Sequence, residues 1–161
     1  MNVFDLAMEM EKDGEKYYLH LAEKTTNSGM KNILGLLAGD EAKHFQVLQK
    51  LKESVKTELV STTILSNSKN IFQMLREEKN WEDIPATQVD LYRKAKEIET
   101  RSFAFYMQKA REISDPRVQK MFFLIAEEEK RHEFLLDNVL QFVSRPQNWL
   151  ENAEFNHLDQ Y

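Results

Sequence analysis

The sequence predicts an all-α protein, an antiparallel four-helix bundle made of two helical hairpins that a long crossover joins. Three observations lead to this prediction. The 161 residues include only four Gly and three Pro, which is too few for the turns of a strand-rich fold. Charged residues make up 30% of the chain, and the mean hydropathy is -0.60. Finally, residues 7–48 align without a gap on residues 95–136, so one helical unit is used twice.

The internal repeat is well above what chance would give. Of the 42 aligned positions, 10 are identical, whereas two unrelated sequences would share about two or three. Most of the other pairs keep their chemical character. The identical pairs are Ala7/Ala95, Glu9/Glu97, Glu11/Glu99, Tyr18/Tyr106, Ala22/Ala110, Leu36/Leu124, Ala38/Ala126, Glu41/Glu129, His44/His132 and Leu48/Leu136.

The first hairpin is expected from the amino terminus to residue 53. Its first helix runs from about Val3 to Lys24, with Asn2 as the N-terminal cap. The break at residues 25–29 is short, so the second helix must turn back antiparallel to the first. This second helix is predicted from about Met30 to Glu53.

The second hairpin repeats this plan. Thr87, with Asp90 three residues later, is typical of a capping box that opens the third helix. Residues 114–116 (Ser-Asp-Pro) then supply a cap and a first-turn proline for the fourth helix. We expect the fourth helix to continue to about Ser144 and to end before Pro146.

The remaining segments are a linker and a tail. Residues 54–86 are too long for a tight turn and contain one short helical pattern at residues 71–75. A crossover of this length lets the second and third helices run in the same direction. We therefore expect one bundle domain over residues 1–145, with a tail at residues 146–161 that packs on the bundle.

Polar residues interrupt the apolar stripe of every predicted helix. The second and fourth helices each carry Glu-x-x-His in the middle of their stripe, and the first and third each carry one Glu with a Tyr seven residues later. These residues are Glu41 and His44, Glu129 and His132, Glu11 and Tyr18, and Glu99 and Tyr106.

Four carboxylates and two imidazoles would thus converge inside one bundle. Burying four carboxylates side by side is prohibitive unless cations or protons neutralise them. Two divalent cations balance four negative charges, and carboxylate oxygen with imidazole nitrogen suits iron or manganese. Two Glu-x-x-His motifs with one further Glu from each of the other helices is the pattern of di-iron carboxylate bundles.

Composition excludes several other classes of function. The chain has no Cys, so disulfides, thiolate zinc sites, iron–sulfur clusters and thiol catalysis are excluded. A net charge of -5 and a pI of about 5.5 give no reason to expect nucleic acid as a partner. No apolar run approaches the roughly 18 residues of a membrane span. The acidic amino terminus does not have the pattern of a secretory signal, and we expect a cytoplasmic protein.

These motifs resemble the rubrerythrin branch of the ferritin-like superfamily. The resemblance covers about residues 3–144 and rests on four segments: Glu11 with Tyr17-Tyr18, Asp40-Glu41-Ala42-Lys43-His44, Glu99 with Phe105-Tyr106, and Glu128-Glu129-Lys130-Arg131-His132. The end of the chain, from Trp149 to Phe155, is also similar to that of stand-alone ferritin-like members.

The resemblance implies a ligand set and roles within it. Two iron ions, with manganese or zinc as substitutes, would be held by Glu11, Glu41, His44, Glu99, Glu129 and His132. Glu41 and Glu129 would bridge the metals as catalytic residues, while Glu11 and Glu99 bind at the ends. Tyr18 and Tyr106 would also serve the reaction, because their hydroxyls would orient a carboxylate of a facing helix.

Two departures from the family pattern have consequences. Full-length rubrerythrins carry a four-cysteine rubredoxin-like module, which this chain lacks, so electrons are expected from a separate donor such as a rubredoxin. Rubrerythrins also place another Glu one turn after the ligand of the third helix. Here that position is Ser102, and its counterpart in the repeat is Gly14. These small residues are expected to leave room for an oxygen ligand beside the metals.

The resemblance implies an oxidoreductase that reduces hydrogen peroxide or dioxygen at a non-haem di-iron centre. Two alternatives stay open. One is an iron-handling protein that oxidises ferrous iron without peroxidase turnover, and the other is a structural bundle that holds zinc or manganese. Aromatic residues at outer positions predict a homodimer, and the long linker would allow the two chains to exchange hairpins.

Overall fold

The computed structural model of the chain describes residues 2–55 and 88–156, with side chains for residues 2–55 and 89–144. Four helices make up this part of the chain: α1 (Val3–Lys24), α2 (Ser28–Ser54), α4 (Gln88–Glu112) and α5 (Pro116–Asn156). The predicted all-α class is confirmed. The predicted cap at Thr87, the helical pattern at residues 71–75 and the packing of the tail lie outside the described residues.

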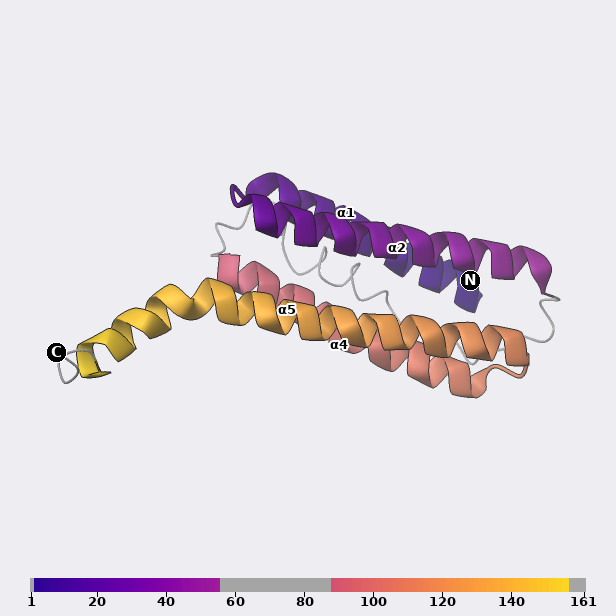
Figure 1. The fold of residues 1–161 in the computed structure, drawn as a ribbon. Helices are drawn as coiled ribbons and strands as arrows, with labels where there is room; N and C mark the ends of the chain where they lie inside the picture. The colour runs from indigo at the N-terminus through magenta and orange to yellow at the C-terminus, as the bar shows by residue number, and fades with distance from the viewer. Residues whose placement is uncertain (1, 56–87, 157–161) are drawn as a thin grey trace.

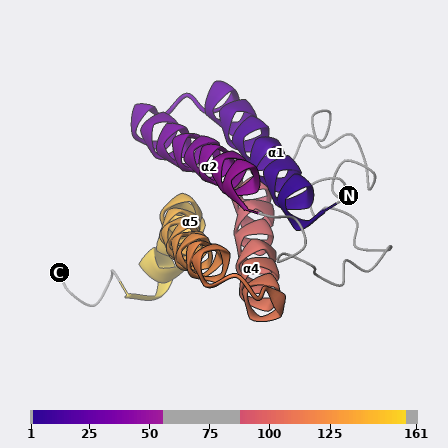
Figure 2. The same ribbon diagram turned by 90° about the vertical axis from the view of Figure 1, so that its right-hand side faces the viewer.

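The helices pair as two antiparallel hairpins, as predicted. α1 packs on α2, and α4 packs on α5, as Figures 1 and 2 show. α2 and α4 run in the same direction, which is what a long crossover allows (Figure 1). The backbones lie closer together within each hairpin than between the hairpins. The space between the hairpins is therefore filled by side chains, and the polar residues of the sequence motifs are among them.

Side-chain caps define where the first two helices begin. The Asn2 side chain accepts a hydrogen bond of 2.9 Å from the Asp5 N–H, which is the predicted cap of α1. Asn27 accepts one of 3.1 Å from the Met30 N–H and caps α2. The second helix therefore begins at Ser28, two residues earlier than predicted, because an Asn within the expected break is itself the cap.

The start of α5 follows the prediction, and its end does not. The Asp115 carboxylate accepts a hydrogen bond of 2.9 Å from the Arg117 N–H, so Asp115 caps the helix that Pro116 opens. The helix then continues to Asn156 instead of ending near Ser144. Figure 1 shows its last turns bending and running beyond the other helices. A proline inside a helix removes one backbone hydrogen bond and bends the helix without necessarily ending it.

Two apolar clusters fill the bundle, one toward each end, and the polar stripe residues lie between them. The first cluster is made of Tyr17, Tyr18, Leu21, Met30, Leu34, Leu37, Ala38, Tyr92, Ala95, Ile98, Leu136 and Val139. The second is made of Val3, Phe4, Ala7, Leu48, Tyr106, Ala110, Ile113, Val118, Phe122, Ile125 and Ala126. On every helix, the central Glu falls between these two groups, so the carboxylates form a layer closed off by apolar packing on both sides.

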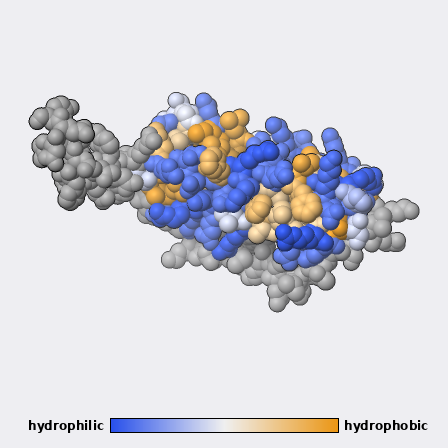
Figure 3. Space-filling model, turned by 60° about the horizontal axis from the view of Figure 1, so that its bottom comes forward, coloured by the Kyte–Doolittle hydropathy of each residue, from blue (hydrophilic) through white to orange (hydrophobic). Residues whose placement is uncertain are grey.

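The surface combines a polar majority with isolated apolar patches. Figure 3 shows a face on which hydrophilic residues surround separate hydrophobic areas. The large exposed apolar side chains of the described residues are Leu19, Leu36, Leu124, Phe134 and Phe142. The homodimer expected from outer aromatic residues stays a prediction. None of the helices in the described ranges has the length and apolar character needed to cross a membrane.

The core ring of Phe122 provides a test of the packing. It is fully buried and meets the rings of Phe4 and Tyr106 edge-on, at centroid distances of 6.0 and 5.5 Å. We expect Phe122→Ala to lower the free energy of unfolding by about 3–5 kcal/mol, because it removes these contacts and leaves a cavity. Phe134→Ala, at a side chain that is 70% exposed, should change it by no more than about 0.5 kcal/mol. Urea unfolding of both variants measures the difference, and similar losses would contradict the assignment of the core.

Candidate metal centre

The structure brings all six predicted ligand residues together in the interior. Each comes from the middle of a helix, and none is more than 5% exposed: Glu11, Glu41, His44, Glu99, Glu129 and His132. The helical spacing explains why. Glu and His at positions i and i+3 share one face of α2 and of α5, and the apolar residues before and after them turn that face inward.

The six residues form two overlapping groups. Within each group, one ligand atom from every residue lies within 4.8 Å of the others. The groups are Glu11, Glu41, His44 and Glu129, and Glu41, Glu99, Glu129 and His132. Glu41 and Glu129 belong to both groups, which is the position of the predicted bridging residues. Glu11 and Glu99 each belong to one group, together with one histidine.

Both imidazoles turn the same ring nitrogen toward the carboxylates. His44 Nδ1 lies 3.2 Å from Glu11 Oε2 and 3.1 Å from Glu129 Oε1. His132 Nδ1 lies 3.2 Å from Glu41 Oε1. The two rings are nearly parallel, with an interplanar angle of 24° and centroids 5.9 Å apart. The Nδ1 atoms are therefore the ones that could bind a metal among these oxygens.

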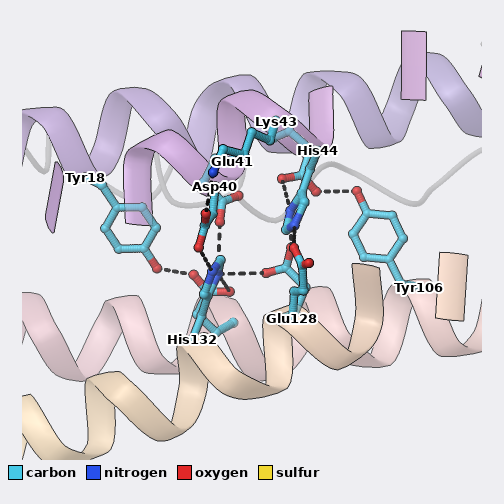
Figure 4. A network of polar contacts seen from close by, with 11 residues as sticks. Tyr18, Asp40, Glu41, Lys43, His44, Tyr106, Glu128 and His132 are labelled. Atoms are coloured by element: carbon cyan, nitrogen blue, oxygen red, sulfur yellow. Dashed lines mark hydrogen bonds and ion pairs between the residues drawn. The ribbon is translucent and has the colours of Figure 1, made fainter. Parts of the chain in front are cut away.

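The other ring nitrogen of each histidine meets a carboxylate that is not among the six predicted ligand residues. His44 Nε2 contacts Glu128, and His132 Nε2 lies 3.0 Å from Asp40 Oδ2 (Figure 4). The side chains of Asp40 and Glu128 are 41% and 46% exposed. The signal that could have found them is the repeat itself, because the two positions are 88 residues apart and both are acidic.

The two predicted tyrosines donate hydrogen bonds to carboxylates of facing helices. The Tyr18 hydroxyl donates to Glu99 Oε1, and the Tyr106 hydroxyl donates to Glu11 Oε1 (Figure 4). Both rings are buried. Burial and the charge of the carboxylate raise the pKa of each tyrosine well above its usual value, so each stays a neutral donor. These contacts cross between the two hairpins.

The buried carboxyl groups differ in their pKa values, because each has different charged neighbours. Burial and the charge of Glu129 raise the pKa of Glu99 to about 8. The same two causes, with the charges of Glu11 and Glu99, raise that of Glu41 well above its usual value. Burial and the charge of Glu11 also oppose ionisation of Glu129, but its contacts with Glu99 and both histidines outweigh them and lower its pKa. Without cations, the centre thus holds protons on some of its carboxyl groups.

The histidines take up charge for a related reason. Burial alone would lower the pKa of His44, but its close contacts with Glu11 and Glu129 outweigh burial and raise the pKa to about 12. The pKa of His132 is raised too, since its contacts with carboxylates again outweigh burial. In the absence of a metal, both imidazoles are therefore cations that partly balance the carboxylates.

The carboxylate oxygens and imidazole nitrogens at the centre are better suited to binding a pair of cations than to hydrogen bonding with one another. Several of these buried atoms have an ion-pair contact with a histidine or carboxylate of the site but no hydrogen bond among the described residues: Glu41 Oε1, Glu99 Oε2, both Glu129 oxygens and His132 Nδ1. Buried oxygens without a hydrogen bond are costly. Two divalent cations would supply the missing partners and balance the four carboxylates, and oxygen with imidazole nitrogen is a ligand set for iron, manganese or zinc.

Comparison with known families gives the same assignment. The family model of rubrerythrin matches residues 2–140. The chain belongs to the rubrerythrin family. A solved structure of a hypothetical protein from Pyrococcus furiosus is similar in fold to this rubrerythrin-family chain. The TM-score is 0.66 and the sequence identity is 19%, and the match covers 91% of this chain and 89% of the other. No curated protein matches the sequence.

The glycine on α1 lies directly against a residue of this rubrerythrin-family site. The Glu41 carboxylate occupies the space beside Gly14, where an added Cβ would lie 2.9 Å from Glu41 Oε2. Gly14 therefore makes room for a protein ligand residue, and the oxygen ligand expected beside Gly14 and Ser102 stays a prediction. Ser102, the position that corresponds to Gly14 in the repeat, is also buried.

The proton balance of the centre predicts how the metal-free protein responds to pH. The pKa of Glu99 rises from 4.5 to about 8 on folding, and that of His44 from 6.5 to about 12. Between pH 6.5 and 8, the folded state therefore holds more protons than the unfolded state, and stability falls as pH rises. The expected slope is about 1.4 kcal/mol per pH unit for each extra proton. Thermal unfolding with a chelator present should show this fall, and a rise over the same range would contradict the proton balance.

The contact between Gly14 and Glu41 predicts a selective effect on metal binding. In Gly14→Ala, the new methyl group must displace the Glu41 carboxylate, so we expect weaker binding of added Zn²⁺. In Gly35→Ala, the methyl group meets nothing within 4 Å, so metal binding should be unchanged and the helix stabilised by about 0.5–1 kcal/mol. Titration with Zn²⁺ and thermal unfolding measure both effects, and equal metal affinities in the two variants would refute the contact.

Proposed function

We propose that this chain is a non-haem di-iron oxidoreductase that reduces hydrogen peroxide, or dioxygen, with electrons from a separate donor. The observation that carries the proposal is the pair of buried Glu/His groups that share two carboxylates. A shared pair of ligand residues is what a two-metal site requires, because bridging carboxylates hold the metals close together. The residues that would hold the iron are Glu11, Glu41, His44, Glu99, Glu129 and His132.

The charges of the site support iron in its divalent form. Four carboxylates balance two ferrous ions, so the filled centre is neutral in an interior where net charge is costly. When bound, the two ferrous ions supply the two electrons that, with two protons, convert one hydrogen peroxide to two waters.

The chain's own residues position the ligands and keep the site dry. The Tyr18 and Tyr106 hydroxyls each hold a carboxylate of the facing helix through a hydrogen bond. Their high pKa keeps them as donors at every physiological pH. Apolar clusters border the carboxylate layer on both sides, and the half-exposed Asp40 and Glu128 lie beside it on α2 and α5. This arrangement favours a small oxidant over a bulky substrate.

Electrons would have to come from outside this chain. None of its 161 residues is a cysteine, so the four-cysteine iron module of full-length rubrerythrins has no counterpart here. We propose that a separate one-electron donor protein, such as a rubredoxin, returns the centre to its reduced form after each turnover.

Removing a shared carboxylate tests the metal centre. In Glu41→Ala or Glu129→Ala, each of the two groups loses one ligand residue, and the histidines lose part of their counter-charge. We expect both variants to lose stoichiometric binding of two Fe²⁺ per chain under anaerobic conditions, while the wild-type protein binds two. Glu97→Ala removes an exposed glutamate that pairs with Arg101 and should leave binding unchanged. Two Fe²⁺ bound per chain in both ligand variants would reject the site.

Stopped-flow mixing of the iron-loaded protein with each oxidant tests the reaction. Fast oxidation by hydrogen peroxide, followed by re-reduction with a reduced rubredoxin, would support the proposed peroxidase activity. Preference for dioxygen, with growth of an iron mineral, would instead support the iron-handling alternative. A protein purified with zinc or manganese and showing no spectral change with either oxidant would refute both.

A further inference from the structure

We infer that Asp40 and Glu128 are positioning residues for the metal centre, each of which orients the histidine of the other hairpin for metal binding. The inference rests on the proposed metal centre and assigns a role to two residues outside its ligand set. Each carboxylate directly precedes a ligand glutamate in the chain, yet it contacts a histidine on the opposite helix (Figure 4).

The same kinds of atom are in contact on both sides of the centre. Glu128, on α5, meets Nε2 of His44, and Asp40, on α2, meets Nε2 of His132 at 3.0 Å. The histidine side chains are only 4% and 6% exposed, while the carboxylates are 46% and 41% exposed. On each side, a buried imidazole therefore lies between the buried carboxylates of the centre and a half-exposed carboxylate at the surface.

The chemistry of imidazole explains what such a contact does. A neutral histidine carries its proton on one ring nitrogen and offers a lone pair on the other. If Nε2–H donates to the carboxylate, the lone pair is on Nδ1, the atom that faces the ligand carboxylates. The opposite tautomer would place a lone pair against a carboxylate oxygen, which is unfavourable. The outer carboxylate therefore selects the tautomer that can bind a metal and fixes the orientation of the ring.

The repeat supports this role over that of ordinary surface charge. Positions 40 and 128 correspond in the repeat and keep a carboxylate, although one is Asp and the other Glu. The neighbouring pair, Gly39 and Glu127, corresponds as well and does not keep its charge. Asp40 also lies 3.7 Å from the exposed ammonium of Lys43, a contact that leaves its other oxygen on the histidine. What the two halves share is the contact with a histidine.

Neutral variants of the same shape test the inference. In Asp40→Asn and Glu128→Gln, the amide can either accept from Nε2–H or donate to Nε2, so it no longer selects the tautomer that binds through Nδ1. Competition of a chelator with the protein for Zn²⁺ should show that each variant loses about 10- to 100-fold in affinity for one of the two metals. Asp40→Glu and Glu128→Asp keep a carboxylate and should bind both metals within a few-fold of wild type, because each places at one position the residue that the other position already uses. Glu127→Gln, on the same helix as Glu128 with its side chain exposed, should change neither affinity.

A spectroscopic readout assigns each effect to one histidine. In the zinc-loaded protein with ¹⁵N-labelled histidine, both Nε2–H protons should give resolved signals, because each is held in a hydrogen bond. Glu128→Gln should broaden or shift the His44 signal and leave that of His132 in place, and Asp40→Asn should do the reverse. Two zinc ions bound by wild type, with unchanged affinities and signals in both variants, would overturn the positioning role alone. Loss of affinity in Glu127→Gln equal to that in Glu128→Gln would also overturn it. A wild-type protein that binds no zinc would overturn the metal centre and this role with it.

Discussion

The cost of burying four carboxylates in one layer is the constraint on which this structure depends. No ordinary arrangement of side chains removes that cost, because two histidines supply at most two positive charges. The raised pKa values of Glu41 and Glu99 are one sign of this imbalance, and the oxygens without hydrogen-bond partners are another. A pair of cations resolves both. The apolar clusters on either side of the layer keep water from stabilising the carboxylates in place of the cations.

The internal repeat supplies the means to build such a layer. Each hairpin contributes one Glu-x-x-His and one single Glu, so two copies of one unit make a centre whose two halves contain the same types of residue. The contacts that complete it cross between the copies: Tyr18 reaches Glu99 and Tyr106 reaches Glu11. Neither hairpin can close the site alone. The backbones of the two hairpins lie farther apart than the two helices within each hairpin. Contacts in the polar layer therefore hold the hairpins in register.

The two halves are not identical, and the differences lie beside the ligand residues. Gly14 allows the Glu41 carboxylate to lie against α1, while the corresponding position beside the other half is Ser102. The outer carboxylates differ in the same way, since Asp40 has a shorter side chain than Glu128. A duplicated unit thus gives a symmetric set of ligand residues, whereas substitutions around it make the two metal positions distinguishable.

Helical periodicity and the repeat by themselves determined the four helices, the inward faces and the convergence of four Glu and two His in the interior, because the spacing of apolar residues dictates which face of a helix is buried. Thus Glu11 and His132 could be placed in the interior before any contact was known. Only the tertiary structure decided that Asp40 and Glu128 meet the histidines, that Glu41 lies against Gly14, and that α5 passes Pro146. These features depend on how two hairpins face each other and on where long side chains end. Periodicity along one helix carries no information about distances between helices.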